Sequence, residues 1–468
     1  MKKEGIFLQS AFQLEGSFMK NEQIVEWIKE QNEKVHVKID KIPFHDLKLW
    51  NANDNAIQHD TGKFFSIIGI RVKTTWDTVS ECWEQPIINQ PEVGFLGFIT
   101  KEFDGVLHFL MQAKIEPGNI NYVQLSPTLQ ATKSNYTQAH KGNAPLYLEY
   151  FQQAKPEQIL LDQLQSEQGA RFLKKRNRNI IIKIEEDIPI YENFIWLTLG
   201  QLKALMSADN LVNMDTRTVI SGIPFGSFET SKINKNSFPA HQNEIKQLFF
   251  ESALTCGKSL HSIDNIISFV TNLKSVHELE IEKIPLAKIA KWNFGKYEIT
   301  HESNKYFKVI AVNVEIGNRE VVNWTQPMIE PAQEGLCAFV CKKINGILHF
   351  AVQAKLECGN FDIVELAPTI QSLTGNYKEK NEIPLPFLDY VLRAGKQQII
   401  YDSYQSEEGG RFYREQNRNM IIFADDKFPD KLPDKFIWMT LNQLHTFLRF
   451  NNYLNIQARS LIAAISFV

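Results

Sequence analysis

Hydrophobic and polar residues alternate along residues 105–116, which predicts a half-buried β-strand. Its apolar face carries Leu107, Phe109, Met111, Ala113 and Ile115, and its polar face carries His108, Gln112, Lys114 and Glu116. A turn signal at Pro117-Gly118-Asn119 precedes a second alternating segment over 120–126. The two segments predict a hairpin whose polar side chains, Gln112, Lys114, Gln124 and Ser126 among them, form one polar floor.

This segment occurs twice in the 468-residue chain. Residues 107–119 return as residues 348–360 with nine of the 13 positions identical, and His349, Gln353, Lys355 and Glu357 repeat the polar face. Such self-similarity predicts a tandem duplication. We expect an N-terminal arm over 1–20, a first repeat over 21–225, a linker over 226–262 and a second repeat over 263–468.

Strand-like and helix-like segments alternate within each repeat. Strands are predicted near 64–73, 94–100 and 158–163 and from Ile180, and a helix is predicted over 146–154. Thr198 to Gln201 is a capping box, and a later helix should begin after Asn213 and end at Gly222. This order predicts a mixed α/β or α+β fold.

Composition narrows the class of protein. The chain is 43% hydrophobic and 22% charged with a net charge of −3, which is typical of a soluble globular protein and not of a nucleic-acid or membrane-surface binder. Its five cysteines form no close pair, which argues against a disulfide framework and against a zinc site. We read neither a signal peptide nor a membrane span, so a cytoplasmic location is expected.

Several longer motifs carry a family resemblance. They are His59 to Phe65, the segment 107–119, Gln130 to Tyr136, Gln165 to Arg178, and Asn213 to Arg217. With them the chain resembles the NDP-hexose 2,3-dehydratases, the dTDP-4-keto-6-deoxyglucose 2,3-dehydratases of deoxysugar pathways, over roughly 20–468. The resemblance implies an α+β fold of two duplicated Nudix-like domains and a homodimer. It also implies two pockets per chain, of which the first is active and the second a remnant.

The implied reaction removes water across carbons 2 and 3 of dTDP-4-keto-6-deoxy-D-glucose. It needs an acid–base pair, a donor to the enolate oxygen and recognition of the pyrophosphate. We expect no cofactor, because the oxidation at carbon 3 balances the reduction at carbon 2, and no glycine-rich dinucleotide fingerprint is present. The segment 166–171 has the single acid Glu167 and not the clustered acids of a Nudix hydrolase, so no metal site is expected either.

A comparison of the two copies marks residues that differ between the pockets. Gln124 becomes Glu365, Ser126 becomes Ala367, Lys133-Ser134 becomes Thr374-Gly375 and Asp215 becomes Gln457. Other groups have identical partners in the second copy: Lys114, Asn135, Tyr136, Glu167, Arg171, Arg178 and Arg217. If one pocket is active, the changed set indicates where the chemistry occurs.

From these patterns we expect two groups of site residues. The catalytic group is Lys114, Ser126, Tyr136, Glu167 and Asp215. The substrate-binding group is His59, Lys63, Gln112, Gln124, Lys133, Ser134, Asn135, Gln165, Arg171, Arg176, Arg178 and Arg217.

Each expected role has a structural alternative. Lys114 could extend to solvent, Tyr136 could be ordinary packing, and the loop at 132–134 could be solvated. Glu167 and Arg171 could be a surface ion pair on a helix, Arg176 and Arg178 could favour a helix end, Asp215 could be a first-turn carboxylate, and His59 could be a core histidine. Two other functions also stay open, a Nudix-type sugar-nucleotide hydrolase and a sugar-nucleotide-binding protein without catalysis.

Overall fold

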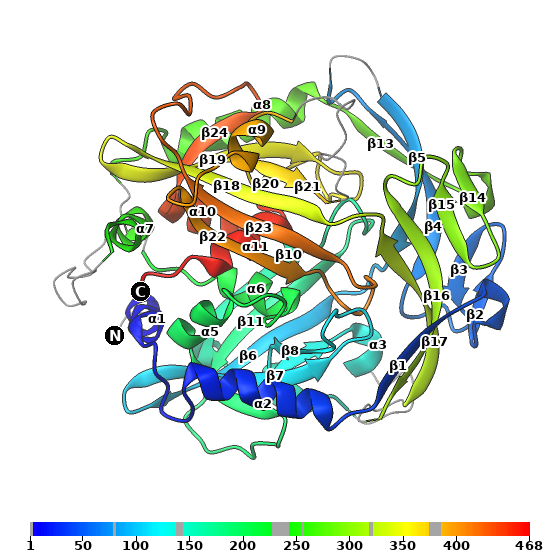
Figure 1. The fold of residues 1–468 in the computed structure, drawn as a ribbon, viewed down its shortest axis with the longest axis horizontal. Helices are drawn as coiled ribbons and strands as arrows, with labels where there is room; N and C mark the ends of the chain where they lie inside the picture. Colours follow the sequence, from blue (N-terminus) through cyan, green and yellow to red (C-terminus); the bar gives the residue numbers. More distant parts are fainter. Residues whose placement is uncertain are drawn as a thin grey trace.

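The chain folds into two similar halves of mixed α+β structure, each with a large and a small sheet (Figure 1). The computed structural model describes residues 3–77, 81–136, 144–226, 243–254, 257–317, 322–373 and 385–468. We call the part up to residue 226 the first half and the part from 243 the second half. The mixed class and the duplication predicted from the sequence are therefore confirmed.

The large sheets of the two halves have the same strand order. The first contains, from edge to edge, β10 (Ile159–Ser166), β11 (Arg176–Lys183), β6 (Gly94–Phe103), β7 (Val106–Ile115) and β12 (Phe194–Thr198), with β8 (Val123–Ser126) and β9 (Leu129–Ala131) paired to β7 and β6. The second contains β22 (Ile399–Ser406), β23 (Gln416–Phe423), β18 (Gly335–Ile344), β19 (Ile347–Leu356) and β24 (Phe436–Thr440), with β20 (Val364–Ala367) and β21 (Ile370–Ser372). Both sheets are mixed, because β11 and β23 run parallel to β6 and β18.

The hairpin predicted from the alternating residues is β7 with β8. Its register pairs Gln112 with Ser126 and Lys114 with Gln124. However, the polar face is exposed to a cavity only at the end of β7. Leu110 is fully buried in a second core with Trp196, and His108 is 1% exposed. The sheet is covered on both faces, so the single polar floor extends over Lys114 and Glu116 alone.

The small sheets exchange a strand between the halves. In the first, β2 (Trp50–Ala52), β3 (Ala56–His59), β4 (Ser66–Thr74) and β5 (Glu81–Asn89) are joined by β13 (Leu279–Ile284) of the second half. In the second, β14 (Trp292–Phe294), β15 (Glu298–His301), β16 (Phe307–Ile316) and β17 (Asn323–Pro331) are joined by β1 (Val37–Ile42) of the first half. Figure 1 shows β1 in blue along the yellow-green β16. Neither small sheet is complete without the other half.

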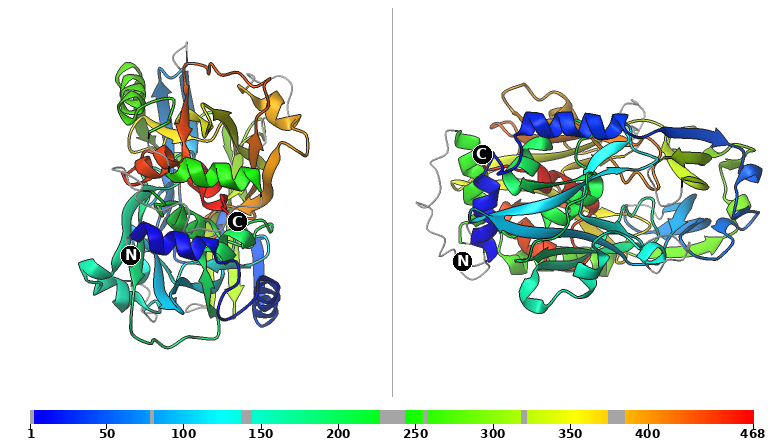
Figure 2. Two further views of the ribbon diagram at one scale, coloured as in Figure 1. Left: turned by 90° about the vertical axis from the view of Figure 1, so that its left-hand side faces the viewer. Right: turned by 90° about the horizontal axis from the view of Figure 1, so that it is seen from below.

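The segments expected as arm and linker each contain a helix that packs on a large sheet. In α1 (Lys3–Phe12), Phe7 stacks on Phe109 with ring centroids 6.4 Å apart, and in α7 (Glu244–Leu254), Phe249 stacks on Phe350 at 6.1 Å. Figure 2 shows α1 and the following α2 (Asn21–Glu33) beside the first large sheet. The counterpart of α2 is α8 (Ile263–Val276). The exact domain boundaries stay a prediction, and linker residues 227–242 lie outside the described residues.

Four helices lie between the two large sheets. They are α5 (Leu199–Leu205), α6 (Met214–Ser221), α10 (Leu441–Leu448) and α11 (Ile456–Ala464) (Figure 1). The predicted caps are present, because the side chain of Thr198 accepts from the N–H of Gln201, and that of Asn213 accepts from the N–H of Thr216 at 2.8 Å. Short helices complete the fold: α3 (Lys133–Tyr136), α4 (Leu148–Gln152), α9 (Leu388–Leu392) and the 3₁₀ turns at Phe44–Asp46, Pro156–Gln158 and Leu286–Lys288.

One local prediction was wrong. The sequence predicted a helix that carries Glu167 and Arg171, and a basic helix end was one alternative for Arg176 and Arg178. The chain instead leaves β10 into an irregular loop, and Arg176 already begins strand β11. Glu167 and Arg171 therefore do not lie on one face of a helix. The loop that carries them packs against the second half, where the N–H of Gly359 donates to the carbonyl of Gly169. No helix in the described ranges is long and apolar enough to cross a membrane.

Candidate active site

A cavity of about 700 Å³ lies where the first half meets two segments of the second half. The small sheet of the first half contributes Lys48, Leu49, Trp50, His59, Phe64 and Phe65, and its large sheet and helices contribute Lys114, Glu116, Gln130, Glu167, Lys175, Asn177 and Asp215. The second half contributes Asn323, Trp324, Thr325, Gln326, Glu408, Gly410 and Arg411. This volume is within the range of cavities that bind small molecules.

Aromatic side chains line one part of the cavity. The ring centroid of His59 lies 4.7 Å from that of Phe64 and 5.3 Å from that of Trp50. His59 is held by a 2.8 Å hydrogen bond between Nδ1 and Oγ1 of Thr61. Trp324 belongs to the second half and faces the same space. Flat apolar faces of this kind suit a nucleobase.

Charged groups line the other part. Asp215 is on the first turn of α6 and only 3% exposed, and its Oδ1 has no hydrogen-bond partner among the described residues. Burial raises the pKa of Asp215 well above its ordinary value, and the carboxylates of Glu116, Glu167 and Glu408 raise it further. Asp215 is therefore a carboxyl group that favours its protonated form and faces the cavity.

Lys114 is the main basic group that opposes this shift in Asp215. Its Nζ donates to the carbonyl of Gln130 at 3.0 Å, and the Gln130 amide donates to Glu116 Oε1 at 2.7 Å. Asn213, the N-cap of α6, donates to Gln130 Oε1 at 3.1 Å and to Ser126 Oγ at 2.7 Å. Ser126 thus supports the helix that carries Asp215 and does not itself line the cavity.

Glu167 and Lys175 form a second charged pair of the cavity wall. The N–H of Glu167 donates to the carbonyl of Lys175 at 2.9 Å, and Asn177 donates to Glu167 Oε1 at 2.6 Å. The Lys175 ammonium donates to the carbonyl of Glu92. Burial lowers the pKa of Lys175 to about 8, although the negative charge of Glu167 acts to raise it. Burial also raises the pKa of Glu167, and the positive charge of Lys175 acts to lower it.

Ser134 of helix α3 is not a lining residue, but it contacts Phe64 of the cavity wall. Its hydroxyl and N–H donate to the carboxylate of Glu92, and its hydroxyl accepts from the N–H of Phe64 at 3.3 Å. Tyr136 packs edge-on against Phe95 with centroids 5.4 Å apart, outside the cavity lining. Lys63 and Lys133 are exposed and also outside the lining, and the side chain of Asn135 lies outside the described residues.

Most of the other expected binding residues have structural partners instead. Arg178 makes a two-point ion pair with Asp162 across β10 and β11, at 2.7 Å for each bond. Five others are also outside the cavity lining. Arg176 lies over the ring of Phe361, and Gln165 donates to the carbonyl of Leu448. The side chain of Gln124 accepts from the hydroxyl of Ser406, Arg217 donates to the carbonyl of Ser406, and Gln112 is half-buried in β7. Several of these contacts join the two halves.

Arg171 does not lie in the first-half cavity, where the comparison of the two copies predicted it. Its guanidinium lies 4.1 Å from the ring centroid of Phe307 in the second half, and it is the equivalent Arg411 that lies over Phe65 in the first-half cavity, at 4.4 Å. The loops cross because the N–H of Gly118 donates to the carbonyl of Gly409, and that of Gly359 to that of Gly169, both at 2.7 Å. The wall of the cavity is therefore completed by the loop of the second half, and the equivalent loop of the first half packs on the second half in the same way.

The lining residues that sequence reasoning missed include Lys175, Trp324, Glu408 and Arg411. A signal existed for Lys175, because the second copy has Glu415 at its position. The other three belong to the second half, and no local pattern assigns them to the first. No group of three or more metal-ligating side chains in the described ranges is spaced to hold a metal ion.

The chain is similar to known proteins along nearly its whole length. A family profile described as NDP-hexose 2,3-dehydratase matches residues 21–223 and again 263–465. A protein of Saccharopolyspora spinosa named dTDP-4-dehydro-6-deoxy-alpha-D-glucopyranose 2,3-dehydratase is 45% identical over 94% of this chain and 90% of its own length. Proteins of the same name from Amycolatopsis orientalis and Streptomyces violaceoruber are each 41% identical, over 98% and 94% of this chain and 92% and 95% of theirs. The chain therefore belongs to the NDP-hexose 2,3-dehydratase family.

Proposed function

We propose that the chain removes water across carbons 2 and 3 of dTDP-4-keto-6-deoxy-D-glucose and forms the dTDP-3,4-diketo-2,6-dideoxy sugar. The observation that carries this proposal is the division of one cavity into an aromatic part and a part with buried, oppositely charged groups. The aromatic part suits the thymine, and the charged part suits proton transfer at the sugar. The names of the relatives support the same substrate.

The reaction sets the tasks of the charged groups. A base takes the proton from carbon 3, which the ketone at carbon 4 acidifies. The hydroxyl on carbon 2 takes a proton and leaves as water, and the enol then loses its O–H proton while carbon 2 gains one. Asp215 suits one of these transfers, because its pKa is raised and its Oδ1 has no hydrogen-bond partner among the described residues, as expected of a carboxyl that exchanges a proton with substrate. Lys114 and Lys175 supply the positive charge that stabilises the enolate oxygen.

We place the reaction in the first-half cavity alone. The second half has Gln457 where the first has Asp215, and Glu415 where it has Lys175. Glutamine cannot transfer the proton, and a carboxylate in place of the ammonium reverses the charge offered to the enolate. The Nudix-type ancestry of each half, the homodimer and the cytoplasmic location remain expectations, and light scattering of the purified chain measures the oligomeric state.

The test is turnover of dTDP-4-keto-6-deoxy-D-glucose by the purified chain. We expect a labile product that has lost one water, trapped with an aromatic diamine and identified by mass spectrometry. Recovery of unchanged substrate from folded protein would rule the proposal out. Magnesium-dependent release of dTMP would instead indicate a hydrolase, and a melting shift with dTDP but without turnover would indicate a binding protein.

A further inference from the structure

We propose that Glu408, a residue of the second half, is a catalytic proton-transfer residue of the first-half cavity. This inference rests on the proposed dehydration and adds a residue that the first repeat alone does not contain. It follows from where the crossing loop places the carboxylate, from the room made for it, and from what replaces it in the other copy.

Glu408 is in the loop that follows β22 and lines the same part of the cavity as Glu116, Glu167 and Asp215. Its Oε1 accepts from the N–H of Gly410 at 3.1 Å. Its Oε2 is buried and has no hydrogen-bond partner among the described residues. One oxygen is thus anchored to backbone and the other is available to a substrate hydroxyl or C–H.

The neighbouring glycine makes room for this carboxylate. A Cβ atom at Gly410 would lie 2.4 Å from Oε1 of Glu408, which is closer than van der Waals contact permits. The equivalent loop of the first half has Gln168 in place of Glu408 and Ala170 in place of Gly410. Both differences occur together, so the Glu408–Gly410 pair is specific to the loop that completes the first-half cavity.

The surroundings let this carboxyl gain or lose a proton near neutral pH. Burial raises the pKa of Glu408 to about 7, the charge of Arg411 opposes this, and Glu116 and Glu167 raise it further. The dehydration needs two such groups. One receives the carbon-3 proton and later delivers it to carbon 2. The other protonates the departing hydroxyl and later receives the enol O–H proton, so both return to their starting states. We assign these two tasks to Asp215 and Glu408.

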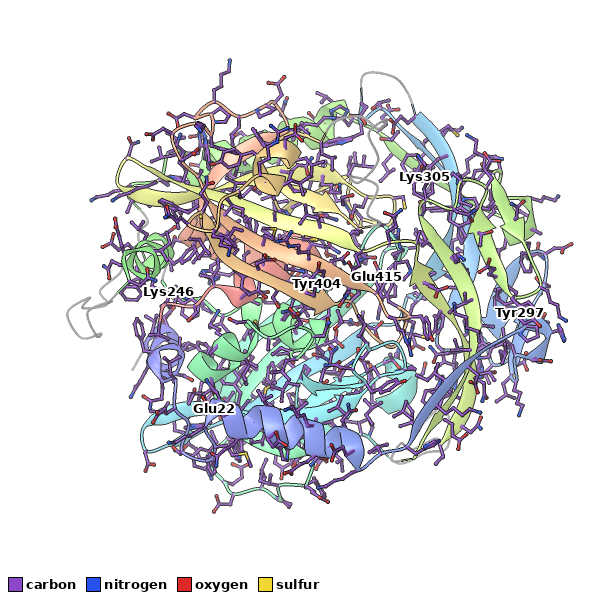
Figure 3. The ribbon with its side chains drawn as sticks, viewed as in Figure 1. Glu22, Lys246, Tyr297, Lys305, Tyr404 and Glu415 are labelled. Carbon is purple, nitrogen blue, oxygen red and sulfur yellow. The ribbon has the colours of Figure 1, made fainter. Side chains whose placement is uncertain are left out.

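This assignment also gives the second half a role in catalysis. At its own equivalent positions it has Gln457 and Glu415 in place of Asp215 and Lys175. Glu415 is 2% exposed and lies where the large and small sheets meet (Figure 3). Neither of its oxygens has a hydrogen-bond partner among the described residues, so it is a buried carboxyl of the opposite side and a matched control for Glu408.

The test uses the full chain with Glu408→Gln, Glu408→Asp and the control Glu415→Gln. Glu408→Gln should lower kcat by about 100-fold or more while calorimetry shows unchanged affinity for dTDP. Glu408→Asp should recover part of the activity, and the residual activity of Glu408→Gln should lack the pH dependence near pH 7 that is expected of the parent chain. Glu415→Gln should turn over at the parent rate.

Three results would overturn the inference: a kcat of Glu408→Gln within about threefold of the parent, an equal loss of dTDP affinity and kcat, or Glu408→Asp no more active than Glu408→Gln. If the parent chain is active and Glu408→Gln is equally active, only this inference is wrong and the proposed function stands. A folded parent chain without turnover removes the proposed function and this inference together.

Discussion

Lys175 and Glu415 occupy equivalent positions of the two halves with opposite charge. The carbonyl of Lys175 accepts from the N–H of Glu167 at 2.9 Å, and the carbonyl of Glu415 accepts from the N–H of Glu407 at 3.0 Å. Both side chains are buried, and each directly precedes a strand of the large sheet. The same backbone arrangement thus presents a cation in the first half and a carboxyl in the second, so the equivalent positions of the two halves differ in charge.

Replacing Lys175 with methionine should lower kcat by about 100-fold, because the enolate loses a buried cation of the kind that typically contributes this much. Methionine keeps most of the side-chain volume. Since burial lowers the pKa of Lys175 to about 8, the parent kcat should decline above that pH as the ammonium loses its proton. A pH–rate profile of both proteins checks this. A Lys175→Met variant with full kcat and the same alkaline decline would contradict it.

Lys114 and Lys355 offer a matched pair for the question of which site is active. They are equivalent residues, and each donates to a glutamine carbonyl, Gln130 at 3.0 Å and Gln371 at 3.4 Å. Lys114→Ala should reduce turnover by about 100-fold or more, whereas Lys355→Ala should leave most of it. Steady-state kinetics with both variants decide the matter. Equal losses would contradict a single active cavity.

The sequence predicted the features that depend on neighbours along the chain. The β7–β8 hairpin, the caps at Thr198 and Asn213 and the mixed fold follow from local patterns, and four expected site residues do line the cavity: His59, Lys114, Glu167 and Asp215. The exchanged strands were not predictable. Val37–Ile42 and Leu279–Ile284 have closely similar patterns, so either could pair with β4 or β16 as far as side-chain alternation is concerned.

The crossing loops caused the remaining errors for the same reason. A comparison of copies assigns Arg171 to the first half, because it follows Glu167 in the chain. In the fold, Arg171 packs on Phe307 of the second half and Arg411 packs on Phe65 of the first. A local signal of this crossing is the glycine repeated at 118 and 359, whose lack of a side chain permits the close approach of the two loops.

Alanine at either of these glycines should destabilise the protein. A Cβ at Gly118 would lie 1.7 Å from the carbonyl oxygen of Phe412, and one at Gly359 would lie 1.7 Å from that of Phe172. Because backbone must move to relieve the overlap, each variant should lose about 2–3 kcal/mol of unfolding free energy, measured by denaturant unfolding. Gly257→Ala is the control, since its Cβ would meet nothing within 4 Å. Unchanged stability of Gly118→Ala would mean that the loops do not cross as described.

Glu415 should make the stability of the chain depend on pH. Burial raises its pKa from an ordinary 4.5 to about 8, so between these values the folded state binds more protons than the unfolded state. Stability therefore falls as pH rises through this window. Glu415→Gln cannot ionise, so its stability relative to the parent should rise by up to about 1.4 kcal/mol for each pH unit between pH 4.5 and pH 8.

Thermal or denaturant unfolding across this range measures the difference between the Glu415→Gln and parent curves. Glu22→Gln, on the exposed face of α2 (Figure 3), is the control and should follow the parent curve. The expected signature is a difference that grows with pH and levels off above about pH 8, where Glu415 of the folded parent is already ionised. A constant difference would mean that Glu415 is as readily ionised in the folded chain as in the unfolded one, which its burial without a hydrogen-bond partner among the described residues argues against.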